Sequence, residues 1–239
     1  MKIVAINGSP KGENGNTNML LSHLGVGIKK AQGTLDIINL KEYDVKPCIG
    51  CYYCWKKEGQ CVHNDDIWVI LHKLLSSDMI ILATPVYCHN VSLLIKRFID
   101  RFTFLMSDAR FYQADDGTYR HIVKYKVPPF VVLSSCNLCE YSNFDIISLY
   151  FNNVAKHVST EVIGEIYRTQ TPVLKMDGII QKIVSEAYWE TLSNAGYELA
   201  TERIISKKTE INLKRSLVDS RFFADYVNEN MENDVISLF

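Results

Sequence analysis

The stretch "KIVAINGSPKGENGNTNMLL" (residues 2–21) decides the fold, because it joins two kinds of apolar pattern through a polar loop. Residues 2–7 are a short apolar run, typical of a buried strand, and residues 16–31 show the apolar spacing of a helix. The loop between them is rich in glycine, hydroxyl and amide groups and is longer than a simple strand-to-helix connection needs. The stretch therefore predicts a strand, a loop and a helix whose N-terminus faces a ligand.

That loop has the chemistry of an anion site. A helix N-terminus offers unpaired N–H groups and the positive end of the helix dipole, and Ser9, Thr17 and Asn18 can add side-chain donors. The loop lacks the G-x-x-x-x-G-K-[ST] pattern of ATP sites and the G-x-G-x-x-G pattern of dinucleotide sites. We therefore expect a phosphate of another kind, with a glycine-rich turn that holds no ligand as the alternative.

The same alternation of buried strand and helix continues along the chain. Further strands are predicted at residues 35–40, 78–87, 130–135 and 158–167, and further helices at 65–77, 92–105, 144–157 and 176–200. Strands that are apolar throughout and alternate with helices indicate a parallel sheet covered on both faces. The fold class is thus α/β, a doubly wound sheet of five parallel strands, with residues 107–127 as a loop or small hairpin inserted before the fourth strand.

We assign residues 1–200 to this domain and residues 201–239 to a helical extension. The extension carries apolar residues at roughly helical spacing, Leu217, Phe222, Tyr226 and Ile236. Apolar faces of this kind rarely stay exposed, so the extension should pack on its own domain or on a second subunit. The second possibility makes a homodimer or homotetramer the expected assembly.

Bulk composition excludes several classes of partner. The formal net charge is -1, which gives no basic field for nucleic acid or for an anionic membrane surface. The longest apolar runs, such as residues 79–87, are too short to span a bilayer. The N-terminus lacks the apolar core and cleavage site of a signal peptide, so we expect a cytoplasmic protein.

The stretch "CIGCYYCWKKEGQC" (residues 48–61) places Cys48, Cys51, Cys54 and Cys61 close together. The chain has an odd total of 7 cysteines, and a reducing compartment disfavours structural disulfides, so a redox or metal site is the first interpretation. Thiolates at this spacing can hold a [4Fe-4S] cluster, whereas zinc usually takes two separated pairs. Zinc, a disulfide and a metal-free loop remain open as alternatives.

Three polar loops should meet at one edge of the sheet. In the flavodoxin-like strand order 2-1-3-4-5, ligands bind at the carboxyl ends of the first and third strands, where the order reverses. The third strand ends in "TPVYCHNVS" (residues 84–92), and the fourth ends in "SSCNLCEYSN" (residues 134–143), which brings Ser134, Ser135 and Cys136 to the same edge. Cys136 and Cys139 are either a redox pair or two inert thiols in a packed loop.

"GSPKGENGNTNMLL", "TPVYCHNVSLLIKRFIDR" and the cysteine segment between them resemble the NAD(P)H-dependent FMN reductases, and within them the iron–sulfur flavoproteins. The resemblance covers about residues 1–200. It implies that the FMN phosphate and ribityl chain are held by Ser9, Lys11, Asn16, Thr17 and Asn18. It implies that the isoalloxazine ring is bordered by Pro85, Val86, Tyr87 and Asn90, while Ser134 and Cys136 lie near its pyrimidine end. His89 departs from the residue usual in the family, and we expect it to be a polar residue at the rim.

The expected function is that of a cytoplasmic FMN oxidoreductase. The resemblance implies that electrons pass from NAD(P)H, or from a ferredoxin-type carrier, through FMN to a small-molecule or protein acceptor. The flavin supplies this chemistry, and no side chain is needed as catalytic acid or base. A [4Fe-4S] cluster on the four cysteines would divide the two-electron chemistry into single-electron steps.

Two other functions stay open. A flavodoxin-like electron carrier is usually strongly acidic, whereas this chain is nearly neutral. A thiol or metal redox sensor would not need the two intact flavin-type loops.

Overall fold

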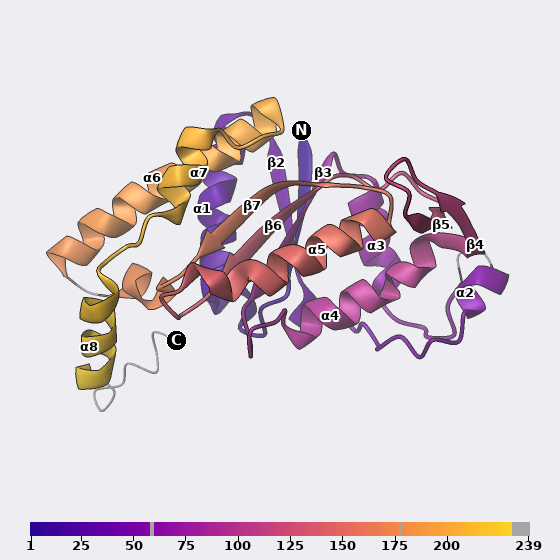
Figure 1. Ribbon diagram of the computed structural model, residues 1–239, viewed down its shortest axis with the longest axis horizontal. Coiled ribbons are helices and arrows are strands. Elements are labelled where there is room, and N and C mark those ends of the chain that lie inside the picture. Colours follow the sequence, from indigo (N-terminus) through magenta and orange to yellow (C-terminus); the bar gives the residue numbers. More distant parts are fainter. Residues whose placement is uncertain (58–59, 177, 231–239) are drawn as a thin grey trace.

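The structure is a computed structural model that describes residues 1–57, 60–176 and 178–230 (Figure 1). Within these residues, one sheet of five parallel strands has the order β2-β1-β3-β6-β7. Its strands are β1 (Lys2–Asn7), β2 (Thr34–Asn39), β3 (Met79–Pro85), β6 (Phe130–Ser135) and β7 (Val162–Arg168). Numbered within the sheet alone, this is the order 2-1-3-4-5, so the flavodoxin-like prediction is confirmed.

Helices cover both faces of the sheet, because successive residues of a buried strand point to opposite sides (Figure 1). Ile3 and Ala5 pack under α1 (Asn16–Lys30) and α6 (Ile179–Glu202). Val4 and Ile6 pack on the opposite face, under α3 (Ile67–Leu75), α4 (Leu93–Ile99) and α5 (Asp145–His157). Both faces of the sheet are therefore buried, as predicted by strands in which apolar and polar residues do not alternate.

The inserted segment forms a hairpin rather than an open loop. Strands β4 (Met106–Gln113) and β5 (Tyr119–Val123) pair antiparallel in a separate two-stranded sheet. The helix predicted at 92–105 gives way at Asp100 to a 3₁₀ segment, Asp100–Leu105, that leads into β4. The cysteine segment contains one further short helix, α2 (Tyr53–Lys56), which lies beside the hairpin in Figure 1.

The C-terminal extension continues as α7 (Lys207–Lys214) and α8 (Ser220–Asn230). Leu217 is buried as predicted, but the predicted contact of Phe222 is wrong, since Phe222 is 49% exposed while Phe223 is 5% exposed. A shift of one position rotates a helix by about 100°, which exchanges the two faces. Ile236 lies outside the described residues. The extension thus packs on its own domain, while the domain boundary and the oligomeric state stay predictions.

Helices α1 and α6 touch through their backbones. A Cβ atom added to Gly27 would stand 1.7 Å from the carbonyl oxygen of Ser193, and one added to Gly196 would stand 2.1 Å from that of Leu24. The C-terminal half of α1 is therefore held in close backbone contact with α6, which limits how far α1 can shift as a whole. In the described part of the chain, we find no helix with the length and apolar character needed to cross a membrane.

Candidate functional site

A cavity of about 330 Å³ opens at the carboxyl edge of the sheet. Three loops surround it, those that follow β1, β3 and β6. Its lining consists of Ser9, Lys11, Asn16, Thr17, Pro85, Val86, Tyr87, Cys88, His89, Ser135, Cys136, Asn137 and Leu138. Loops separated by more than a hundred residues thus meet where the reversal of strand order predicts a ligand site.

The loop after β1 is held in shape by a buried amide. Asn7 donates from Nδ2 to the Oδ1 of Asn39 at 2.9 Å and to the carbonyl of Gly12 at 3.3 Å, and its Oδ1 accepts from the N–H of Ser9 at 3.0 Å. Gly12 has φ +56°, a left-handed conformation that favours glycine. The internal hydrogen bonds leave the Ser9 hydroxyl at the cavity wall, close to Gly15 at the start of α1.

The first turn of α1 supplies the floor of the cavity. Thr17 Oγ1 lies 2.9 Å from Ser135 Oγ, which joins the loops after β1 and β6. Asn16 donates from Nδ2 to Thr171 Oγ1 at 3.1 Å, and its buried Oδ1 has no hydrogen-bond partner among the described residues. A buried acceptor without a partner is costly, so this oxygen is suited to a donor on a bound ligand.

The charge at this end of the cavity suits an anion. Lys11 lines the cavity, and none of the described lining residues is a carboxylate. Lys175, in the segment after β7, lies near enough that burial, and then the positive charge of Lys11, lowers the pKa of its amine. Two cations and a helix N-terminus therefore surround the loop after β1, an arrangement that favours a bound phosphate group.

The loop after β3 is a tight, strained turn. The backbones of Tyr87 and Asn90 exchange two hydrogen bonds, of 2.9 and 3.0 Å, across Cys88 and His89. Cys88 has φ +47° and His89 has φ +57°. Two left-handed residues in succession are typical of a type I′ turn, which glycine and asparagine normally occupy. The N–H of Val86 donates to the carbonyl of Ser135 at 2.9 Å, which fixes this turn against the loop after β6.

The structure brings most of the predicted flavin residues together. Three of them do not line the cavity: Asn18 donates to the carbonyl of Glu13, Asn90 accepts from the N–H of Val91, and Ser134 donates to the carbonyl of Thr84. Each of these side chains is hydrogen-bonded to a backbone group instead.

Sequence reasoning missed Cys88, which lines the cavity in the turn after β3, and four residues in the loops after β6 and β7. Asn137 and Leu138 line the cavity just after Cys136, and Thr171 donates to Asn137 Oδ1 at 2.6 Å. Lys175 lies nearby, in the segment after β7. The only sequence signal for all four was their position after a predicted strand.

The thiols of Cys136 and Cys139 point to different surroundings. Cys136 lines the cavity and accepts a hydrogen bond from the N–H of Leu138, and burial raises the pKa of its thiol. Cys139 contacts the extension instead, with its sulfur 3.9 Å from the carbonyl of Ser220. These contacts favour the interpretation of two inert thiols, and all 7 cysteines are free.

A second, smaller hollow of about 80 Å³ lies in the cysteine segment. It is lined by Cys48, Ile49, Gly50, Cys51, Tyr52, Cys54, Cys61, Val62, His63, Arg101, Thr103 and Phe104. All four predicted cysteines therefore border one hollow. Across residues 1–57, 60–176 and 178–230, no group of three or more His, Cys, Asp or Glu side chains has the geometry of a metal site. The cluster stays a prediction.

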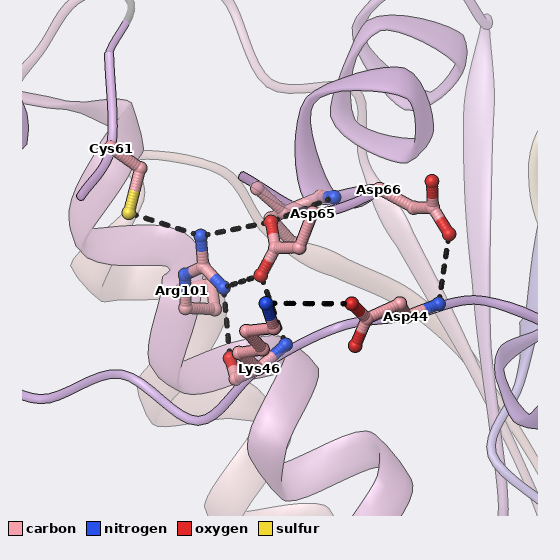
Figure 2. A network of polar contacts seen from close by, with 7 residues as sticks. Asp44, Lys46, Cys61, Asp65, Asp66 and Arg101 are labelled. Atoms are coloured by element: carbon pink, nitrogen blue, oxygen red, sulfur yellow. Dashed lines mark hydrogen bonds and ion pairs between the residues drawn. The ribbon is translucent and has the colours of Figure 1, made fainter. Parts of the chain in front are cut away.

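A buried ion pair lies at the base of this hollow (Figure 2). The side chains of Arg101 and Asp65 are 2% and 0% exposed, with Nη1 and Oδ2 2.6 Å apart. Burial alone would raise the pKa of the Asp65 carboxyl, but hydrogen bonds from Arg101 and from the backbone of Lys46 outweigh it and hold that pKa below its ordinary value. The other guanidinium nitrogen, Nη2, lies 3.2 Å from the sulfur of Cys61.

The sequence model of the NADPH-dependent FMN reductase family matches residues 1–123, about half of the chain. An iron-sulfur flavoprotein of Archaeoglobus fulgidus is 43% identical over 101 residues, which cover 42% of this chain and 48% of that protein. One from Methanocaldococcus jannaschii is 41% identical over 101 residues, 42% of this chain and 51% of that protein. The chain spans about half the length of the curated relatives it matches.

Solved structures agree on the fold. An FMN-dependent NADH-azoreductase from Bacillus anthracis, solved in complex with FMN, superposes with a TM-score of 0.61 at 17% identity, covering 84% of this chain and 99% of that one. An NAD(P)H:quinone oxidoreductase from Methanothermobacter marburgensis gives 0.57 at 12% identity, with coverage of 83% and 98%. At such low identity, these likenesses establish the architecture alone.

Proposed function

Since this chain belongs to the NADPH-dependent FMN reductase family, we propose that it binds FMN in the cavity at the carboxyl edge of the sheet and acts as an NAD(P)H-dependent oxidoreductase. The observation that carries the proposal is the convergence of three polar loops on one cavity whose described lining includes a lysine and no carboxylate. The residues fit the cofactor. Donors and positive charge suit the phosphate at one end of the cavity, and Pro85, Val86 and Tyr87 offer apolar and aromatic surface to the flavin ring at the other.

The residues have separable tasks. Ser9, Thr17 and the N–H groups at the start of α1 bind the phosphate, together with Lys11, while the unpartnered Oδ1 of Asn16 accepts from a ribityl hydroxyl. The strained turn after β3 presents Tyr87 and backbone N–H groups along one edge of the ring.

The loop after β6 borders the pyrimidine end of the ring through Ser135, Cys136 and Asn137. Burial raises the pKa of the Tyr87 phenol above its ordinary value.

When bound, FMN would supply the redox chemistry, which is uptake of a hydride from NAD(P)H and transfer of electrons to an acceptor. The protein binds the phosphate and orients the ring, and it needs no acid or base of its own. A small-molecule acceptor would bind over the exposed face of the ring, beside Tyr87, which is 46% exposed.

The cysteine hollow supports a finer proposal, a [4Fe-4S] cluster on Cys48, Cys51, Cys54 and Cys61. In its favour, four thiols line one hollow, and a buried guanidinium donates a hydrogen bond to one of them that would stabilise an anionic sulfur ligand. With the cluster, a ferredoxin-type protein becomes a suitable donor or acceptor. A cytoplasmic homodimer or homotetramer completes the proposal.

Anaerobic purification tests these proposals. We expect the absorbance bands of FMN, a stoichiometric gain of bound FMN on titration, and steady-state oxidation of NADH or NADPH. Bound FMN without oxidation of either nucleotide would indicate an electron carrier, and failure to bind FMN at all would refute both readings. Iron and sulfide assays on the same sample decide the cluster, because flavin bands without iron would remove it.

A further inference from the structure

Arg101 joins parts of the cysteine segment that are distant in sequence (Figure 2). Its Nη1 donates to the carbonyl of Lys46 at 2.8 Å, just before the first cysteine, and to Asp65 Oδ2 at 2.6 Å. Its Nη2 donates to Cys61 Sγ at 3.2 Å and to Asp65 Oδ1 at 3.3 Å. One guanidinium therefore contacts the start of the segment, its last cysteine and the approach to α3.

Asp65 also joins the start of the cysteine segment to the start of α3, through hydrogen bonds from backbone N–H groups. Its Oδ2 accepts from the N–H of Lys46 at 2.9 Å, and its Oδ1 accepts from that of Ile67 at 3.3 Å. Next to it, the backbones and side chains of Asp44 and Asp66 form two hydrogen bonds of 2.8 Å. The two ends of the segment are thus fastened together at its base.

We propose that Arg101, fixed by Asp65, is the positioning residue of the cysteine hollow, which holds both ends of the segment and presents Cys61 as its anchored ligand. The identity of the ligand set rests on the proposed [4Fe-4S] function. Among the four thiols, that of Cys61 receives a hydrogen bond from the buried guanidinium. Such N–H donors stabilise negative charge on a ligand sulfur and favour the reduced state of a cluster.

Geometry explains why arginine is needed here. Two separate nitrogens of one planar group reach the Lys46 carbonyl and the Cys61 sulfur while both remain on Asp65. A lysine ammonium keeps the charge but has a single nitrogen and cannot span these partners. Arg101→Lys therefore separates positioning from charge.

The test compares Arg101→Lys and Asp65→Asn with a matched control, Asp100→Asn. Asp100 lies next to Arg101 in sequence and forms an exposed ion pair with Lys96, so the control removes a carboxylate without touching the segment. Wild type and the three variants are reconstituted anaerobically with iron and sulfide. We expect chelator to strip iron about 10- to 100-fold faster from the two test variants. Arg101→Lys should also shift the cluster midpoint to more negative potential.

Two readouts keep the inference testable without a cluster. Bound FMN per chain should stay at the wild-type level in every variant, which shows that the sheet is folded. In the metal-free chain, trypsin should cleave after the exposed Lys56 and Lys57 several-fold faster in the test variants than in the control. If wild type takes no iron but this cleavage difference holds, the cluster is refuted and the positioning role is supported. Wild-type stripping and cleavage rates in Arg101→Lys would overturn the inference.

Discussion

Gly27→Ala should destabilise the protein, although alanine is the better helix former. The added Cβ would lie 1.7 Å from the Ser193 carbonyl oxygen, 2.7 Å from its carbon and 2.8 Å from the Tyr197 nitrogen. Ordinary contact needs roughly 3.5 Å, so α1 and α6 must separate by about 2 Å. Overpacking of this kind costs about 1–3 kcal/mol and sometimes more, against about 1 kcal/mol gained in helix propensity.

We expect a net loss of about 2 kcal/mol, the upper end of this difference, because the obstructing atoms belong to backbone and cannot rotate away. For a chain of this length, the loss lowers Tm by about 4–8 °C in a thermal melt. Bound FMN should fall as well, since the cavity floor belongs to the first turn of α1.

Gly25→Ala is the matched control on the same helix. Its Cβ would meet only Leu35 Cδ2, at 3.1 Å, which is the end of a flexible side chain. This variant should melt at or above the wild-type temperature, because it keeps the gain in helix propensity. If Gly27→Ala melts as high as Gly25→Ala, the backbone contact between the two helices is not as close as described.

Three further predictions concern the cavity and the extension. Thr17→Val should weaken FMN binding about 10- to 100-fold in a fluorescence titration, while Asn18→Ala, outside the cavity lining, should leave it unchanged. His89→Gly should raise the free energy of unfolding in urea by up to about 1 kcal/mol, because it removes left-handed strain; a loss would contradict the strained turn. Burial alone would raise the pKa of Glu198, but hydrogen bonds from the Ser206 backbone and from Thr209 and Ser206 hydroxyls hold it below the ordinary 4.5. That stability is present above pH 4.5 and lost as the pH falls below it, so Glu198→Gln should flatten the acid limb of stability.

The sheet and the gathering of its loops were predictable because they follow from hydrophobic runs and topology. Five apolar runs separated by helical patterns leave few arrangements, and the carboxyl ends of parallel strands must share an edge. Ser9, Pro85 and Cys136 met at the cavity for that reason. The long, periodic segments carried this information by themselves.

What could not be predicted depends on tertiary contacts between single side chains. Nothing local distinguishes Arg101 from other arginines, because its role depends on Asp65, 36 residues away in sequence. The choice between Phe222 and Phe223 depends on helix phase, which a weakly periodic segment does not determine. Asn18 looked like a ligand by residue type, yet its side chain is occupied by its own backbone.

The fastening at Lys46, Cys61 and Asp65 also bears on how this segment can change over evolutionary time. The two fastened ends close the segment into a loop, and the entropy cost of closing a loop grows only slowly with its length. Changes of length between the two fastened ends should therefore leave the strands and the cavity in register.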